Sequence, residues 1–140
     1  MDTNEINKLL SNEKHFVGVF ARDRLPYRTG RPAGLVINHD KASERGSHWV
    51  AYYISPSGNA QYFDPLGDPI PDNEILSFIK RNEGGGWSRT TYSNIPFQSS
   101  DSTKCGQLCI FFLRARLRGR SACEVHAMLS QNPAVNDAVV

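Results

Sequence analysis

The segment from Cys105 to Leu113 constrains the fold more than any other part of the chain. It reads CGQLCIFFL, and at about 100° per helical residue its polar neighbours Gln107, Arg114 and Arg118 fall on one narrow stripe. A helix that is apolar around most of its circumference must be covered by other elements. The sequence therefore predicts a central buried helix that begins at Cys105.

Apolar segments elsewhere predict the sheet against which this helix packs. Strands are expected where β-branched and aromatic residues cluster between turn signals. The expected strands are Phe16–Phe20, Gly34–Asn38, His48–Ile54, Ala60–Phe63 and Trp87–Ser93. A turn-forming segment joins the third to the fourth, so these two are predicted to form an antiparallel hairpin.

Further helices are predicted by N-terminal signals that precede periodic apolar residues. The first helix is expected to carry Ile6, Leu9 and Leu10 on one face. The signals are acidic starts at Asp2 and Asp72 and a Ser-x-x-Glu capping box at Ser121. With no internal repeat or linker, residues 1–140 are predicted to form one α+β domain. The buried helix is expected to pack on a mixed or antiparallel sheet.

Composition excludes several classes of function. The net charge of +2 is too small to indicate a nucleic-acid or anionic-membrane partner. No apolar run approaches the roughly 18 residues of a spanning helix, and the polar start MDTNEINK is unlike a signal peptide. All three cysteines follow residue 104, which favours a reducing intracellular compartment over a disulfide framework. No Cys/His pattern has the spacing of zinc ligands, so no metal is expected.

Cys105 stands at the predicted start of the buried helix. Unpaired N–H groups and the helix dipole favour negative charge there, so a thiol at this point tends towards thiolate. The following Gly106 allows another part of the chain to approach closely. Taken alone, the position fits a buried structural cysteine better than a nucleophile, because free cysteine is among the most buried residue types.

Other residues supply the partners that a nucleophilic cysteine needs. His48 begins the strongest predicted strand, and Asp64 follows the strand that pairs back on it. The hairpin can therefore bring the imidazole and the carboxylate together, so that Asp64 orients His48. Gln98 lies seven residues before Cys105 in a Ser/Asp/Thr-rich segment. Its side-chain amide and the backbone N–H of Cys105 would form an oxyanion hole.

The order His, acid, Gln, Cys, with the local stretches HWVAYY, YFDPLG and Q-x6-CGQLC, resembles the adenovirus protease (adenain) family. The proteases of adenovirus-like invertebrate viruses and of virus-like Polinton/Maverick transposons resemble it most, since GVFARDRLP also matches their N-terminal stretch. The resemblance spans about Gly18 to Leu117. Papain-like proteases place the cysteine before the histidine, so the order excludes that arrangement.

The resemblance implies a thiol endopeptidase. Cys105 would be the nucleophile, His48 the general base and then acid, and Asp64 the orienting carboxylate. Gln98 would be the oxyanion donor, whereas Gly46 and Trp49 would bind substrate. Family members cleave capsid and core precursors during virion maturation, often at Gly-containing sites. A protein precursor is therefore the expected partner, for an enzyme that acts in the host cytoplasm or nucleus and can be packaged in the virion.

Adenovirus proteases also use DNA and a disulfide-linked peptide as activators, and this sequence departs from that pattern. It has no cysteine before Cys105, so only a noncovalent activator peptide remains open. On a continuous helix Arg114 and Arg118 would lie about 160° around the axis from Arg116 and Arg120. The four arginines would then not form one stripe that follows a phosphate backbone. We expect no cofactor, at most weak DNA binding, no membrane partner and a monomer.

Two other readings remain open at this stage. Asp64 stands where adenovirus enzymes commonly carry Glu, and Asp is what proteases that remove SUMO or ubiquitin-like modifiers use. A deconjugating protease is therefore the alternative. A capsid-binding pseudoprotease is disfavoured, because all four proposed catalytic residues are present.

Overall fold

A computed structural model of the chain describes residues 1–39, 48–68, 71–84, 89–93, 96–97 and 104–129. Four helices and one five-stranded sheet lie within these ranges. In chain order they are α1 (Thr3–Leu10), β1 (Phe16–Ala21), β2 (Ala33–Asn38), β3 (Trp49–Ile54), β4 (Ala60–Phe63), α2 (Asn73–Glu83), β5 (Thr90–Tyr92), α3 (Cys105–Leu117) and α4 (Ala122–Met128). The predicted α+β class is confirmed.

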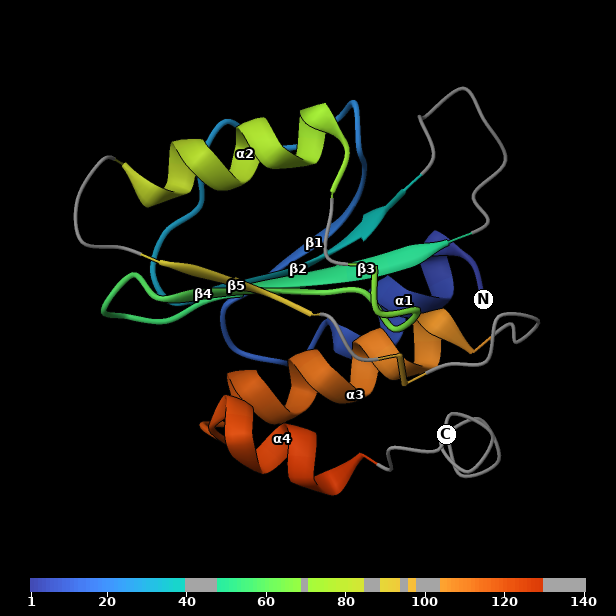
Figure 1. Cartoon of the computed structure of the whole chain (residues 1–140). Helices are drawn as coiled ribbons and strands as arrows, with labels where there is room; N and C mark the ends of the chain where they lie inside the picture. The colour runs from blue at the N-terminus through green and yellow to red at the C-terminus, as the bar shows by residue number, and fades with distance from the viewer. Residues whose placement is uncertain (40–47, 69–70, 85–88, 94–95, 98–103, 130–140) are drawn as a thin grey trace.

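The sheet is mixed, and its strands lie side by side in chain order. Strands β2, β3 and β4 pair antiparallel, whereas β1 and β5 pair parallel with β2 and β4 at the two edges. Helix α2 covers one face of the sheet, and α1, α3 and α4 lie on the other (Figure 1). The helix that begins at Cys105 is therefore in the layer that packs directly on β3.

Alternation along β3 divides the core into two halves. Side chains of successive strand residues point to opposite faces of a sheet. Trp49, Ala51 and Tyr53 pack in the cluster formed with α1, α3 and α4. The residues between them, Tyr52 among them, pack in the cluster beneath α2. Because all six residues of β3 are buried, this strand is the centre of the molecule.

The predicted helix caps are present. Asp2 and Asp72 each accept a hydrogen bond from a backbone N–H of the first turn that follows. Ser121 and Glu124 form the predicted capping box of α4. Helix α2 ends at Gly84, whose φ of 66° lies in the left-handed region that favours glycine.

Four of the five predicted strands differ from the observed ones at one or both ends, and one predicted helix face is less buried than expected. The last strand begins at Thr90, and Trp87 lies outside the described residues. Strand β3 begins at Trp49, one residue after His48. Leu9, predicted to be buried with Ile6, is 46% exposed. It lies about 100° around the helix from Leu10, so it is at the edge of the buried face rather than within it.

No helix in the described part of the chain combines the length and hydropathy needed to cross a membrane.

Candidate active site

The antiparallel pairing of β3 and β4 places His48 beside Asp64. Ala51 lies opposite Phe63, so the residue before β3 and the residue after β4 share one end of the sheet. His48 Nε2 lies 2.8 Å from Asp64 Oδ1. The same carboxylate oxygen accepts the backbone N–H of Leu66 at 2.9 Å. Asp64 is only 3% exposed, so it meets the imidazole in a largely dehydrated environment.

Ser93 holds the backbone of Asp64, a contact that sequence reasoning missed. Its Oγ accepts the N–H of Asp64 at 2.8 Å and lies 3.3 Å from the carbonyl oxygen of the same residue, to which it can donate. Ser93 is itself buried and extends the β4–β5 ladder through a bond from its N–H to the Tyr62 carbonyl. A serine at the end of a predicted strand was visible in the sequence. The parallel pairing of that strand with β4 was not.

Cys105 is the first residue of α3, and the helix has no side-chain cap there. Lys104 occupies the N-cap position and makes no side-chain hydrogen bond to the first turn. Cys105 is 5% exposed and shares a hydrogen bond with His48. Because Asp64 takes Nε2 of the ring, Nδ1 is the nitrogen left to face the thiol. The structure thus brings three of the four predicted catalytic residues together in the order Cys105, His48, Asp64.

The electrostatics of this group favour a charged cysteine–histidine pair. Burial alone would lower the pKa of His48, but hydrogen bonds to Asp64 and Cys105 raise it to about 9. Burial alone would raise the pKa of the Cys105 thiol. Hydrogen bonds from His48 and from the backbone N–H groups of Trp49 and Gly106 lower it instead. At neutral pH the shifts together favour thiolate and imidazolium, the reactive form of such a pair.

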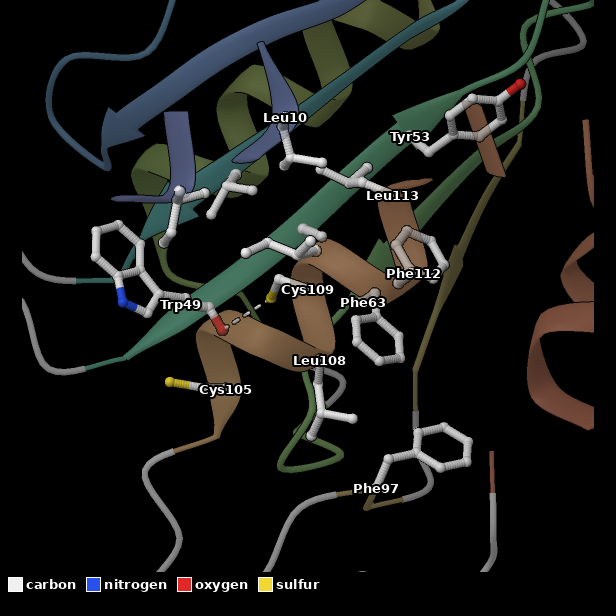
Figure 2. Close-up of a cluster of buried hydrophobic side chains, with 14 of the residues drawn as sticks. Leu10, Trp49, Tyr53, Phe63, Phe97, Cys105, Leu108, Cys109, Phe112 and Leu113 are labelled. Carbon is white, nitrogen blue, oxygen red and sulfur yellow. Dashed lines mark hydrogen bonds between the residues drawn. The ribbon is translucent and has the colours of Figure 1, made fainter. Parts of the chain in front are cut away.

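Cys109, one turn further along α3, has the opposite character. Its side chain is fully buried, and burial raises the pKa of its thiol well above the usual value. Its Sγ–H donates to the carbonyl of Trp49 at 3.4 Å. Figure 2 shows the Cys109 thiol within the apolar cluster, whereas the Cys105 thiol projects away from it at the helix start. Cys109 is therefore a packing residue.

Trp49 and Gly106 lie in contact beside the thiol, together with Met1. A Cβ added at Gly106 would lie 3.2 Å from the Met1 side chain and 3.3 Å from the Trp49 ring. The predicted close approach of another part of the chain at Gly106 is thereby confirmed. The Trp49 indole N–H also donates to the Met1 carbonyl at 3.3 Å.

The remaining predicted site residues, Gln98 and Gly46, lie outside the described residues. The residue before Gln98 is described and firmly held. Phe97 is fully buried, and its N–H donates to the Pro65 carbonyl at 2.8 Å. Its ring stacks on Phe63 with centroids 6.0 Å apart. The segment that leads into Gln98 is therefore attached to the segment that carries Asp64.

Other titratable side chains in the described ranges form no second site of this kind. His126 bonds to the buried Gln61 side chain at 3.2 Å, and burial lowers the pKa of its imidazole. Within those ranges, no three His, Cys, Asp or Glu side chains are grouped so that they could hold a metal ion.

Similarity to known proteins points towards viral cysteine proteases. No protein-family model matches the sequence. The chain is 29% identical over 122 residues to the SUMO-1 cysteine protease S273R of African swine fever virus (isolate Tick/South Africa/Pretoriuskop Pr4/1996). It has the same identity to the cysteine protease S273R of the Vero-adapted Badajoz strain. Each match includes 76% of this chain and 44% of the viral protein, so the chain spans under half the length of these relatives.

A solved structure shares the fold. The central domain of the uncharacterized Lpg1148 protein from Legionella pneumophila superposes with a TM-score of 0.59. The match includes 99% of this chain and 90% of that domain, at 12% sequence identity. At that identity the likeness concerns the fold alone, whereas the sequence similarity to the viral enzymes concerns cysteine proteases.

Proposed function

We propose that the chain is a cysteine endopeptidase whose nucleophile is Cys105. The observation that carries the proposal is the buried series Cys105–His48–Asp64, in which the pKa of the thiol is lowered and that of the imidazole raised. A cysteine that only packs in the core does not require a neighbouring histidine and carboxylate that lower its pKa. Cys109 is such a residue, since burial raises the pKa of its thiol. The similarity to viral cysteine proteases supports the same reaction class.

The proposed reaction follows the usual order for a thiol protease. The Cys105 thiolate attacks the scissile carbonyl, and the oxyanion is held by the Cys105 backbone N–H and the Gln98 side-chain amide. The His48 imidazolium then gives its proton to the leaving amine, which leaves a thioester on Cys105. Neutral His48 next takes a proton from water, and the oxygen of that water attacks the thioester carbonyl. The C–S bond then breaks, which releases the carboxylic acid and restores the Cys105 thiolate beside protonated His48. Asp64 keeps the ring oriented throughout.

The proposed substrates are structural precursor proteins of a virus or virus-like element, cut at Gly-containing sites during particle maturation. This follows from the resemblance to adenovirus-type proteases. Trp49 is proposed to bind substrate because its side chain lies beside the nucleophilic turn, in contact range of Gly106. Gly46 is proposed on the resemblance alone. We propose that the enzyme works as a monomer in a reducing compartment of the host, with a noncovalent peptide as its one potential activator.

A second candidate is a protease that removes ubiquitin-like modifiers. The name of a relative favours this candidate: the matching protein of the Pretoriuskop isolate is a SUMO-1 cysteine protease. Both candidates use the same catalytic group, so only the substrate separates them.

One experiment tests the function. Purified protein is incubated with a Gly-containing precursor peptide and, in parallel, with a ubiquitin-like protein fused to a reporter. We expect cleavage of the first, lost by several orders of magnitude in Cys105→Ala and nearly as much in His48→Ala. Asp64→Asn should retain measurable activity, and Gln98→Ala should lower kcat by about 10²-fold.

The matched control is Cys123→Ser, which removes an exposed free thiol far along the chain in α4. It should leave turnover unchanged. Cleavage of the fusion alone would select the second candidate. Full activity of a folded Cys105→Ala protein would refute both, and cleavage of neither substrate would favour a capsid-binding pseudoprotease.

A further inference from the structure

A groove runs along the face of α3 that points away from the sheet. Helices α1 and α4 both pack against α3 and border this groove, whose volume is about 540 Å³. Its floor is formed by Ile110 and Phe111 of α3, with Leu9 on one side and Met128 on the other. The predicted polar stripe of α3 lines it as well. In the described part of the chain, the side of α3 that is left uncovered is therefore the one on which this stripe lies beside Phe111.

Exposed apolar side chains gather at this groove. Six large hydrophobic residues are exposed within the described ranges, and three of them line it: Met1, Leu9 and Met128, at 40%, 46% and 51%. Contiguous exposed apolar surface on a soluble protein commonly marks a binding site. Methionine is well suited to such a surface, because its flexible side chain adapts to different partners.

Arginines edge the groove, and no acidic side chain lines it within the described residues. Arg118 pairs with Glu13 at 2.7 Å, but its side chain is 63% exposed and that of Glu13 only 9%. The guanidinium is therefore the more exposed of these two paired charges. Arg120 is 58% exposed and pairs loosely with Glu124 at 3.4 Å. It lines the groove with Arg114 and Arg118, because α3 ends at Leu117 and the predicted separation of these arginines applies only to a continuous helix.

Two polar atoms within the groove have no hydrogen-bond partner in the described part of the chain. They are Oε1 of Gln107, an acceptor, and Nε of Arg114, a donor. The two residues are seven positions apart on α3, which separates them by about 10 Å along the helix axis. Both atoms are buried, so a peptide in the groove can bond to them, through an N–H at Gln107 and a carbonyl or carboxylate at Arg114, only if these two side chains turn outward.

We propose that this groove binds an acidic amphipathic peptide segment of a partner protein. The apolar side of the segment covers Ile110 and Phe111, and its carboxylates meet the arginine edge at Arg114, Arg118 and Arg120. Nucleic acid fits less well, because a phosphate backbone leaves the apolar floor uncovered. The proposal is independent of the proposed catalysis, since the groove uses a different side of α3 from the Cys105 thiol.

Fluorescence anisotropy on the full chain tests the proposal. The probe is a labelled 15-residue peptide of alternating Leu and Glu blocks, compared with the same peptide carrying Lys for Glu and with a duplex DNA of similar length. We expect the Glu peptide to bind at least about tenfold more tightly than the Lys peptide, as two or three exposed charge pairs allow. The Arg118→Ala/Arg120→Ala double variant should lose about tenfold in affinity, and Met128→Lys should lose binding measurably.

The matched control is the Arg24→Ala/Arg28→Ala double variant, which removes the same charge from exposed positions outside the groove. It should bind the Glu peptide like wild type, and melting curves of all variants should coincide within a few degrees. Equal affinity for the Glu and Lys peptides would overturn the proposal, as would groove-dependent binding of the DNA.

Two other occupants are tested in the same way. If a protein ending at Leu129 binds the peptide more than tenfold more tightly, residues 130–140 occupy the groove and the partner assignment is wrong. If Met128→Lys dissociates a dimer seen by sedimentation, the groove is a contact between copies of this chain, which also overturns the proposal.

Discussion

At the scale of single residues, the proposed chemistry depends on which of two neighbours holds a proton. The pKa of Cys105 is lowered and that of His48 is raised to about 9, so the thiolate–imidazolium pair exists between the two values. Below the lower value the thiol is protonated, and above about pH 9 the imidazole is neutral. The Cys105–His48 hydrogen bond contributes to both shifts, whereas Asp64 also raises the pKa of His48 and the backbone N–H groups of Trp49 and Gly106 also lower that of Cys105.

This pairing predicts the pH dependence of thiol alkylation. In a Cys123→Ser background, Cys105 should react with iodoacetamide at neutral pH, where an ordinary thiol of pKa 9 is largely protonated. His48→Ala should move the midpoint of the rate profile to higher pH, because only the backbone N–H groups of Trp49 and Gly106 then oppose the effect of burial on the thiol pKa. Peptide mapping should find Cys109 unlabelled in the folded protein. Identical profiles for the two proteins would contradict the pairing.

A second prediction concerns Ser93, which acts on the reaction only through Asp64. Ser93→Ala leaves the buried N–H of Asp64 without its 2.8 Å acceptor, a loss of about 1–3 kcal/mol in unfolding free energy. We expect kcat to fall while KM is nearly unchanged, with Ser93→Thr restoring much of the loss. The control is Ser77→Ala, at an exposed position of α2. A rise in KM with constant kcat would argue against positioning.

The proposed catalytic residues and their neighbours differ in how far the sequence alone could identify them. His48 and Asp64 could be paired because a short hairpin fixes which strand ends meet. Ser93 could not, because its contact depends on two strands that are distant in the chain and lie parallel. The family resemblance indicates Trp49 as a substrate-binding residue. Its contacts with Gly106 and Met1 could not be predicted from the sequence. The role of Gln98 stays a prediction.

At the scale of elements, α3 was predicted from its apolar circumference, and its packing explains that composition. Helix α3 packs on β3 and β2 of the sheet and also contacts α1 and α4. The hairpin and the caps were also predictable, since each depends on local sequence. The parallel edges of the sheet were not, because their pairing is set by long connections that carry no local signal. The end of α3 at Leu117 was also not predictable, because the first helix-terminating residue in the sequence is Gly119, two positions later.

The two faces of α3 predict unequal costs for adjacent substitutions. Phe112 is fully buried and stacks on Phe63 with ring centroids 4.5 Å apart, so Phe112→Ala should cost about 3–5 kcal/mol. Phe111 is only partly buried and lines the groove, so Phe111→Ala should cost clearly less. Urea unfolding of the two variants measures the difference. Equal losses would mean that the groove face is packed as tightly as the sheet face.

At the scale of the whole molecule, the buried strand β3 separates two apolar layers that differ in their distance from the proposed catalytic residues. The layer beneath α2 contains Tyr52 and Tyr62 and lies away from the catalytic group. The layer beneath α3 contains Cys105 and Trp49, so the packing that stabilises the fold also positions the proposed nucleophile. Substitutions beneath α2 should therefore act on stability first, whereas those beneath α3 should act on stability and turnover together.

The charge of the whole chain predicts activity without nucleic acid. The net charge is +2, and the arginines near the end of α3 are engaged: Arg118 with Glu13, Arg114 with the Leu9 carbonyl, and Arg116 with the Tyr53 ring at 4.4 Å. The positive surface that remains is that of the exposed Arg118 and Arg120, each paired with a glutamate, so any DNA binding should be weak and lost with added salt.

The predicted activity without nucleic acid is checked by measuring the turnover of nuclease-treated protein in reducing buffer, with and without duplex DNA. We expect the two rates to agree within about twofold, because exposed charge pairs contribute little free energy. The Cys123→Ser variant should keep this turnover without reductant. Cys105 and Cys109 are buried, so the exposed Cys123 is the thiol most open to forming a disulfide with another molecule. Strict dependence on DNA, or activity that needs a disulfide, would show that the catalytic group is assembled by a partner rather than by the fold itself.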